Sequence, residues 1–118
     1  MPGLFNNSMS NGRNSKIDSK IFVKVHKSYR TVVAVCDSEL IGKKFEEGIK
    51  QLDIRESFYK GEEKSFKEVI EILKFQKKED ATFNIVGENS IKASKKAGIV
   101  DDKSIFKIKK IPFSLVLL

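Results

Sequence analysis

The side chains best suited to chemistry in this chain are lysines and arginines, and they are unevenly placed. Residues 1–30 hold six of them against one acid (net +5), and residues 92–110 hold seven against two (net +5). Residues 31–91 hold ten against thirteen acids (net −3). Basic ends around a mildly acidic middle favour a polyanionic partner such as nucleic acid. The alternative interpretation is a solvated, lysine-rich surface without a partner.

Twelve of these cations are the candidates for phosphate contacts. They are Arg13, Lys16, Lys20, Lys24, Lys27, Arg30, Lys92, Lys95, Lys96, Lys107, Lys109 and Lys110. The three from Lys92 to Lys96 follow the i, i+3, i+4 spacing that places side chains on one face of a helix. We expect recognition of RNA by shape, because few exposed aromatic side chains are available to stack on bases.

Other chemistry is weakly supported. The only cysteine, Cys36, lies in an apolar run, where thiols are normally inert, and no metal-like spacing surrounds the only histidine, His26. Residues 83–90 place Gly87 between a strand and a helix, but they lack the further glycines and the Lys-Ser/Thr of a P-loop. We therefore predict no catalytic residue, metal or cofactor, and expect a binding protein more than an enzyme.

Two alternative functions stay open. A nucleotide-binding module or enzyme of unknown reaction would use Asp37 and the Gly87 turn, because a helix N-terminus can bind an anion. A protein–protein adaptor would use the acidic middle of the chain and Phe75, which falls outside the apolar stripe of its predicted helix. The adjacent aromatics Phe58 and Tyr59 are expected to anchor their loop to the core.

These side chains need a scaffold of strands and short helices. Residues 21–26 and 31–36 predict an antiparallel hairpin. Residues 37–48 predict a short helix that Asp37 or Ser38 caps and Gly48 ends, with Leu40, Ile41 and Phe45 on its buried side.

The clearest predicted helix begins at Ser65, which forms a capping box with Glu68. The buried stripe of this helix is Phe66, Val69, Ile70 and Leu73. Residues 81–86, 105–108 and 113–118 read as strands, and residues 89–97 as a helix that Gly98 ends. The order predicts an α/β or α+β fold, in which a small mixed sheet starts with the hairpin and packs with about three short helices.

The chain divides into a tail and one domain. Residues 1–20 are rich in Asn, Ser, Gly and Lys, which predicts a flexible basic tail, with Met9 as an alternative start. Residues 21–118 predict a single compact domain. No apolar run approaches the roughly 20 residues that span a bilayer, and no apolar signal segment opens the chain. We therefore expect a cytoplasmic protein without membrane contact.

Several segments resemble, in their order and spacing, a small archaeal family, the domain of unknown function numbered four-two-four. They are Phe22–His26, Val33–Leu40 with Gly42-Lys43, Phe45–Gly48, Phe58-Tyr59 with Gly61-Glu62, Asn84–Glu88 and Ala97–Asp101. The resemblance covers about residues 21–113 and implies a compact α/β protein from an archaeal cytoplasm, with no established activity and no catalytic residue to carry over. Two departures add charge here: Lys109–Pro112 replaces a glycine-containing approach to the late proline, and the tail lies outside the family pattern.

Taken together, the sequence predicts an RNA-binding accessory protein of the archaeal translation machinery. It would be associated with a ribosomal subunit and would contact rRNA phosphates through the basic tail and the lysine clusters. Ribosomal proteins would be its further neighbours.

Overall fold

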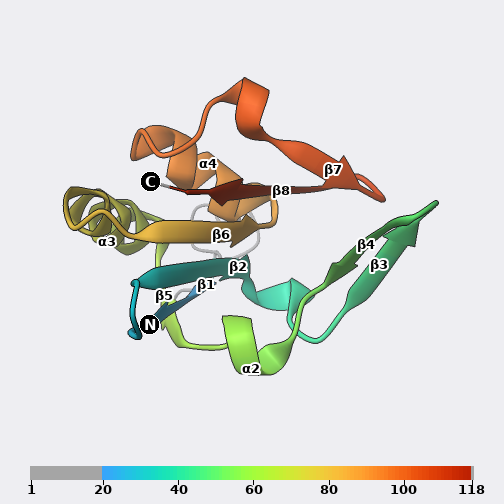
Figure 1. Cartoon of the computed structure of the whole chain (residues 1–118), viewed down its shortest axis with the longest axis horizontal. Helices are drawn as coiled ribbons and strands as arrows, with labels where there is room; N and C mark the ends of the chain where they lie inside the picture. The colour runs from blue at the N-terminus through green and yellow to red at the C-terminus, as the bar shows by residue number, and fades with distance from the viewer. Residues whose placement is uncertain (1–19, 118) are drawn as a thin grey trace, which may run out of the picture.

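A six-stranded mixed sheet forms the centre of the molecule (Figure 1). The computed structural model describes residues 20–117. The strands lie in the order β5-β1-β2-β6-β8-β7. Their bounds are β1 Ile21–His26, β2 Val32–Asp37, β5 Glu62–Lys64, β6 Thr82–Val86, β7 Phe106–Ile108 and β8 Ile111–Val116. Only β2 and β6 pair in parallel, and all other neighbours in this sheet are antiparallel.

Two helices, α3 (Phe66–Lys78) and α4 (Glu88–Lys96), cover one face of the sheet. Apolar side chains from the central strands meet them there, with Val33, Phe83 and Leu73 fully buried. This face holds the larger core, and α3 and α4 lie against each other over it. The other face carries a second, smaller core around Cys36, which makes the sheet the middle layer of the fold.

The second face is covered by short elements between β2 and β5. They are η2 (Ser38–Leu40), β3 (Lys44–Glu47), β4 (Lys50–Asp53) and α2 (Glu56–Tyr59). A further short helix, η3 (Asp102–Ser104), precedes β7. The β3–β4 hairpin extends away from the body of the molecule (Figure 1), and Ile49 at its tip is fully exposed. Within residues 20–117, no helix is long and apolar enough to cross a membrane.

The predicted hairpin and the predicted main helix are both confirmed. β1 and β2 pair antiparallel from Ile21↔Asp37 to His26↔Val32. Ser65 caps α3 as a capping box: Glu68 N–H donates to Ser65 Oγ at 3.2 Å, and Ser65 N–H donates to Glu68 Oε1 at 2.8 Å. The described residues form a mixed sheet, a hairpin and three α-helices, so the fold is a small α+β domain, within the predicted classes.

The predicted helix over residues 37–48 is wrong. Only Ser38–Leu40 is helical, as one 3-10 turn, and β3 follows. Gly48 has a φ of +64° and opens a two-residue turn between Glu47 and Lys50, where glycine favours a tight hairpin. The pairing Phe45↔Leu52 then places these two apolar side chains on the same face of the hairpin, toward the second core. Tertiary burial therefore outweighs the helix-like spacing of the apolar residues.

The segment between β4 and β5 is anchored as expected. Tyr59 is buried, and Phe58 packs against the second core with its ring edge-on to Tyr59 at 4.9 Å. The segment is more ordered than the predicted loop, because it forms the one-turn helix α2 and then strand β5.

Candidate nucleic-acid interface

The candidate cations that the structure describes lie in four separate places, one of which is Lys20 at the start of β1. Arg13 and Lys16 fall outside the described residues. Lys24, Lys27 and Arg30 lie at or near the β1–β2 turn, whereas Lys107, Lys109 and Lys110 lie at the β7–β8 turn, and Lys92, Lys95 and Lys96 lie on α4. Because β8 runs antiparallel to β6 and β6 runs parallel to β2, the two turns lie at opposite ends of the sheet. The structure therefore does not join all the predicted residues into one surface.

Three of the predicted lysines line one pocket between α4 and the β7–β8 edge of the sheet. Lys92 and Lys95 come from α4 and Lys107 from β7, around a space of about 350 Å³. Apolar side chains of Ile91, Ile105 and Pro112 also line the pocket. We call this the lysine pocket. It combines cationic groups with an apolar lining. The cations suit a phosphate, and the apolar side chains suit the face of a nucleotide base.

Acidic groups reduce the charge of the lysine pocket without cancelling it. Lys95 Nζ lies 2.6 Å from Asp102 Oδ1, and this hydrogen bond and charge lower the pKa of the Asp102 carboxyl. Glu88 also lines the pocket. Within residues 20–117, neither Lys92 nor Lys107 forms an ion pair, and both are exposed. Three ammonium groups therefore face two carboxylates, and two of the three are available to an anion.

The β7–β8 turn next to this pocket has unusual backbone geometry. Ile108 pairs with Ile111, so Lys109 and Lys110 are the two central residues of the turn, with φ values of +52° and +68°. Such turns favour Gly, which has no Cβ, and Asn, whose short polar side chain is tolerated in the left-handed region, whereas other side chains are strained there. Lys109 N–H donates to Glu47 Oε1 at 2.9 Å, which ties the turn to the β3–β4 hairpin. Two exposed lysines thus occupy positions that disfavour lysine.

The cations before and along β1 and at the β1–β2 turn have a different character. Lys24 is half-buried, and its Nζ donates to the Ser57 carbonyl at 2.7 Å, so this side chain connects β1 to α2. Lys27 and Arg30 are exposed on the turn itself. Lys20 is exposed at the start of β1, where its carbonyl accepts from Ser38 N–H at 3.3 Å.

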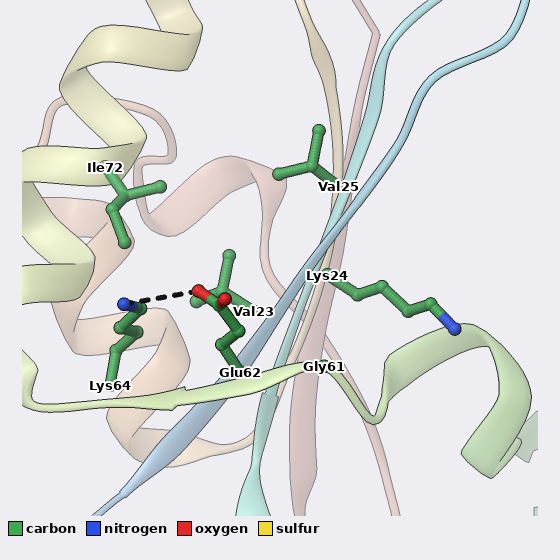
Figure 2. A pocket seen from close by; sticks show the side chains of 7 residues that line it. All are labelled: Val23, Lys24, Val25, Gly61, Glu62, Lys64 and Ile72. Carbon is green, nitrogen blue, oxygen red and sulfur yellow. Dashed lines mark ion pairs between the residues drawn. The ribbon is translucent and has the colours of Figure 1, made fainter.

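The groove between β1, β5 and α3 carries no free cation (Figure 2). It has a volume of about 380 Å³ and is lined by Val23, Val25 and Ile72, among others. Figure 2 shows the ion pair of Glu62 with Lys64, 3.2 Å long, at this groove and the Lys24 side chain directed away toward α2. The charges at the groove are therefore compensated, and its lining is mainly apolar.

The site of the nucleotide-binding alternative is already occupied by a side chain of the protein. Asp37, at the end of β2, accepts from the backbone N–H groups of Asn89 at 3.1 Å and Ser90 at 2.8 Å. Ser90 Oγ also donates to Asp37 Oδ1 at 2.7 Å. Asp37 thus caps the N-terminus of α4 and not the helix predicted to follow it, and it fills the position that an anion would take.

Burial of Asp37 has an electrostatic consequence. Only 4% of the residue is exposed, and this burial raises the pKa of the carboxyl, against the opposing effect of the hydrogen bonds from Ser90 and Asn89. Gly87 has a φ of +109°, and a Cβ there would overlap the Asp37 carboxylate. The Gly87 turn is therefore explained by the fit of this internal cap, which weighs against a nucleotide site at this point.

Cys36 and His26 do not form a reactive pair. Phe22 pairs with Cys36 while His26 pairs with Val32, so the two side chains are separated by four positions along the hairpin. Burial raises the pKa of the Cys36 thiol to about 12, which keeps it protonated. His26 is half-buried. Its ring stacks on Phe58 with the ring centroids 4.6 Å apart, and its Nε2 lies 2.8 Å from the Phe58 carbonyl oxygen, so His26 connects β1 to α2.

No three His, Cys, Asp or Glu side chains of residues 20–117 are grouped as a metal site requires.

One surface was missed when the sequence was considered alone. Phe75 is 60% exposed on α3, and Lys74, Lys77 and Lys78 line the same pocket. The signal was present, because positions 71, 74, 75 and 78 fall on one face of a helix. The sequence analysis named Phe75 only for the protein–protein adaptor and did not consider its lysine neighbours.

Comparison with known proteins identifies a family and a fold. A family described as "Protein of unknown function (DUF424)" matches residues 26–118. No curated protein matches the chain. The crystal structure of an uncharacterized conserved protein from Methanopyrus kandleri, an archaeon, matches with a TM-score of 0.76 at 20% identity. The match covers 83% of this chain and 90% of that chain, and at this identity it shows that the two proteins share a fold.

Proposed function

We propose that this chain, which belongs to the DUF424 family of proteins of unknown function, binds RNA through the lysine pocket and the adjoining β7–β8 turn. The wider role we propose is that of an accessory protein of the archaeal translation machinery, located in the cytoplasm and contacting rRNA phosphates on a ribosomal subunit. The observation that carries the proposal is that Lys92, Lys95 and Lys107 line one pocket. This pocket lies beside the β7–β8 turn, in which two lysines have positive φ values.

The exposure of these lysines suits a phosphate backbone. An exposed ammonium group loses little hydration on contacting a phosphate, and it releases counterions from the nucleic acid. Lysine acts as a point charge and does not fix the orientation of a planar group as arginine does. A surface that relies on lysines therefore recognises the path of the backbone more than a base sequence, which agrees with recognition by shape.

The β7–β8 turn adds an independent argument. Each non-glycine residue in the left-handed region costs about 1 kcal/mol of stability. Asn and Gly would relieve this strain without removing the backbone N–H that Lys109 donates to Glu47. Within residues 20–117 neither lysine forms an ion pair, so their charge supports a role in binding a polyanion.

The alternatives have weaker support. A nucleotide at the Gly87 turn would have to displace the Asp37 carboxylate from the two N–H groups that it already accepts. A protein adaptor remains compatible with the exposed apolar side chains Phe75 and Ile49. These residues lie on different elements, α3 and the tip of the β3–β4 hairpin.

A salt titration of RNA affinity tests the proposed surface. The variant Lys92→Gln with Lys107→Gln is compared with the control Lys43→Gln with Lys67→Gln. This control removes the same charge from exposed lysines that belong neither to the lysine pocket nor to the β7–β8 turn. Losing two phosphate contacts should reduce the slope of log K against log salt by roughly 1.5. The control should keep a slope closer to that of the wild type. Equal losses in both variants would show that binding follows net charge alone and would refute this surface.

Sedimentation of a native lysate tests the wider role. We expect the protein to migrate with a ribosomal subunit through a sucrose gradient and to remain there after a wash at moderate salt. A protein that stays at the top of the gradient under all conditions would contradict the link to translation. The salt titration would still decide whether the lysine pocket binds RNA.

A further inference from the structure

We propose that Phe75 stacks on an unpaired base of single-stranded RNA and that the lysines around it hold the adjoining phosphates. This inference rests on the proposed function, because it extends the path of the RNA from the lysine pocket across α4 to α3. It adds a ligand class, an unstacked base, that the lysine pocket alone does not require. It also adds base stacking to the recognition by shape that was expected from the small number of exposed aromatic side chains.

Phe75 lies outside the buried face of α3. Val69 and Leu73 of the same helix are fully buried, whereas Phe75 lies two positions after Leu73 and is 60% exposed. A rotation of 100° per residue places Phe75 on the far side of the helix from that buried stripe. Its ring therefore presents apolar surface to solvent, which is the geometry a stacking platform needs.

Lysines surround this ring. The pocket beside Phe75 has a volume of about 350 Å³ and is lined by Lys74, Lys77 and Lys78 together with Glu71 and Ala97. Lys77 Nζ donates to the Gly98 carbonyl at 2.9 Å, and Lys74 Nζ lies 3.8 Å from Glu71. Lys78 forms no ion pair within residues 20–117. An aromatic ring with three ammonium groups and one carboxylate around it matches a base with its phosphates.

The two pockets lie on either side of α4. Lys92 and Lys95 line the lysine pocket, whereas Ala97, just beyond the end of the helix, lines the pocket at Phe75. Lys92 and Lys96 are exposed and one helical turn apart, so they lie along α4 in the direction of Phe75. A single strand that leaves the lysine pocket can thus follow cationic side chains to the exposed ring.

The surroundings of Phe75 favour RNA over a protein partner. A protein-binding surface has an apolar core of several side chains, with charged residues depleted from it. At Phe75 the ring has four charged neighbours in its pocket and only Ala97 as an apolar one. The other exposed large side chains of the sheet, Phe106 and Leu115, share the opposite face with Phe113, which packs on the second core.

A tryptophan reporter tests the contact directly. The chain contains no tryptophan, so Phe75→Trp introduces a single fluorophore at the proposed site. Stacking of a base should quench its emission when an oligouridine of about 12 nucleotides is added. Phe106→Trp is the matched control, because Phe106 is 59% exposed but lies on the opposite face of the sheet. Equal quenching of both reporters, or none at Phe75→Trp, would refute stacking at Phe75.

A second variant separates this inference from the proposed function. Phe75→Leu keeps an apolar side chain but removes the aromatic face, and we expect about tenfold weaker binding of the oligouridine with unchanged binding of an RNA duplex. Wild-type affinity for both RNAs in this variant, together with weak binding by Lys92→Gln with Lys107→Gln, would refute the stacking site and leave the proposed function standing. Loss of a co-purifying protein in Phe75→Leu, with RNA affinity intact, would overturn the inference in favour of a protein contact.

Discussion

The carboxylate of Asp37 occupies the space that a side chain at Gly87 would need. Asp37 is the last residue of β2, and Gly87 directly follows the parallel strand β6, with Cys36↔Val86 as the final pair of the two strands. Because Gly87 has no Cβ, the Asp37 carboxylate can reach the backbone N–H groups of the first turn of α4. The hydrogen bond from Ser90 N–H to Asp37 Oδ1 joins residues 53 positions apart and fixes the start of α4 relative to the sheet.

Gly87→Ala should destabilise the protein strongly. The substitution combines a positive φ with a steric overlap on a buried carboxylate, so we expect a loss of at least about 2 kcal/mol in the free energy of unfolding. Chemical denaturation monitored by circular dichroism measures it. Gly42→Ala is the control, because Gly42 has a φ of +82° but no atom within 4 Å of the added Cβ. Equal losses of unfolding free energy in the two variants would mean that the overlap with Asp37 does not contribute to the destabilisation by Gly87→Ala.

Asp37→Asn should change how stability depends on pH. Burial raises the pKa of Asp37 above its ordinary value of 3.8, so the folded protein binds a proton at higher pH than the unfolded chain does. The stability of the wild type relative to Asp37→Asn should therefore decrease as pH rises from below 3.8 through the raised pKa. Urea titrations at a series of pH values measure this difference. A difference that grows with pH would show a lowered pKa and contradict the assignment.

Relieving the strained turn should stabilise the protein while weakening RNA binding. Lys109→Asn with Lys110→Gly supplies the residues that a two-residue turn with positive φ prefers, so we expect about 1 kcal/mol of added stability. The same variant removes two cations and should lower RNA affinity at low salt. Thermal unfolding and an RNA-binding titration on one preparation test both effects. Unchanged RNA affinity in this variant would show that Lys109 and Lys110 do not contribute to RNA binding.

Cys36 should be almost unreactive in the native state. A pKa of about 12 in place of 9.0 leaves roughly a thousandfold less thiolate at neutral pH, and the side chain is fully buried. Labelling with a thiol reagent should therefore follow unfolding. Rapid labelling without denaturant would show that the second core opens easily, and would contradict the burial of this residue.

The parts of the fold that local patterns determine were predictable. The capping box at Ser65 and the apolar stripe through Leu73 identify α3 because every contact involved lies within one helix. The β1–β2 hairpin was found for the same reason, since a short turn joins its strands.

The misread segment shows where local patterns are ambiguous. Leu40, Ile41 and Phe45 have a spacing that fits a helix, yet Phe45 belongs to a strand paired with Leu52. The ambiguity is resolved only by the second core, to which buried residues from six different elements contribute. No short segment of the sequence shows which distant residues form this core.

The candidate site was predicted in part. The lysines of α4 and Lys107 were named individually, but their convergence depends on β8 placing β7 beside α4, a pairing that no local pattern specifies. The cap by Asp37 was assigned to the wrong helix for the same reason, because its true partners lie more than 50 residues away.

The position of β8 also sets the order in which the molecule can be completed during synthesis. β8 lies between β6 and β7, so the edge of β6 stays unpaired until residues 111–116 have left the ribosome. Until then β6 presents open backbone groups and apolar side chains that are buried in the finished protein, such as Phe83 and Ile85. A nascent chain stalled before Ile111 would therefore expose a strand that readily joins other chains. Rapid completion of translation, or a chaperone at this stage, would protect the protein from aggregation.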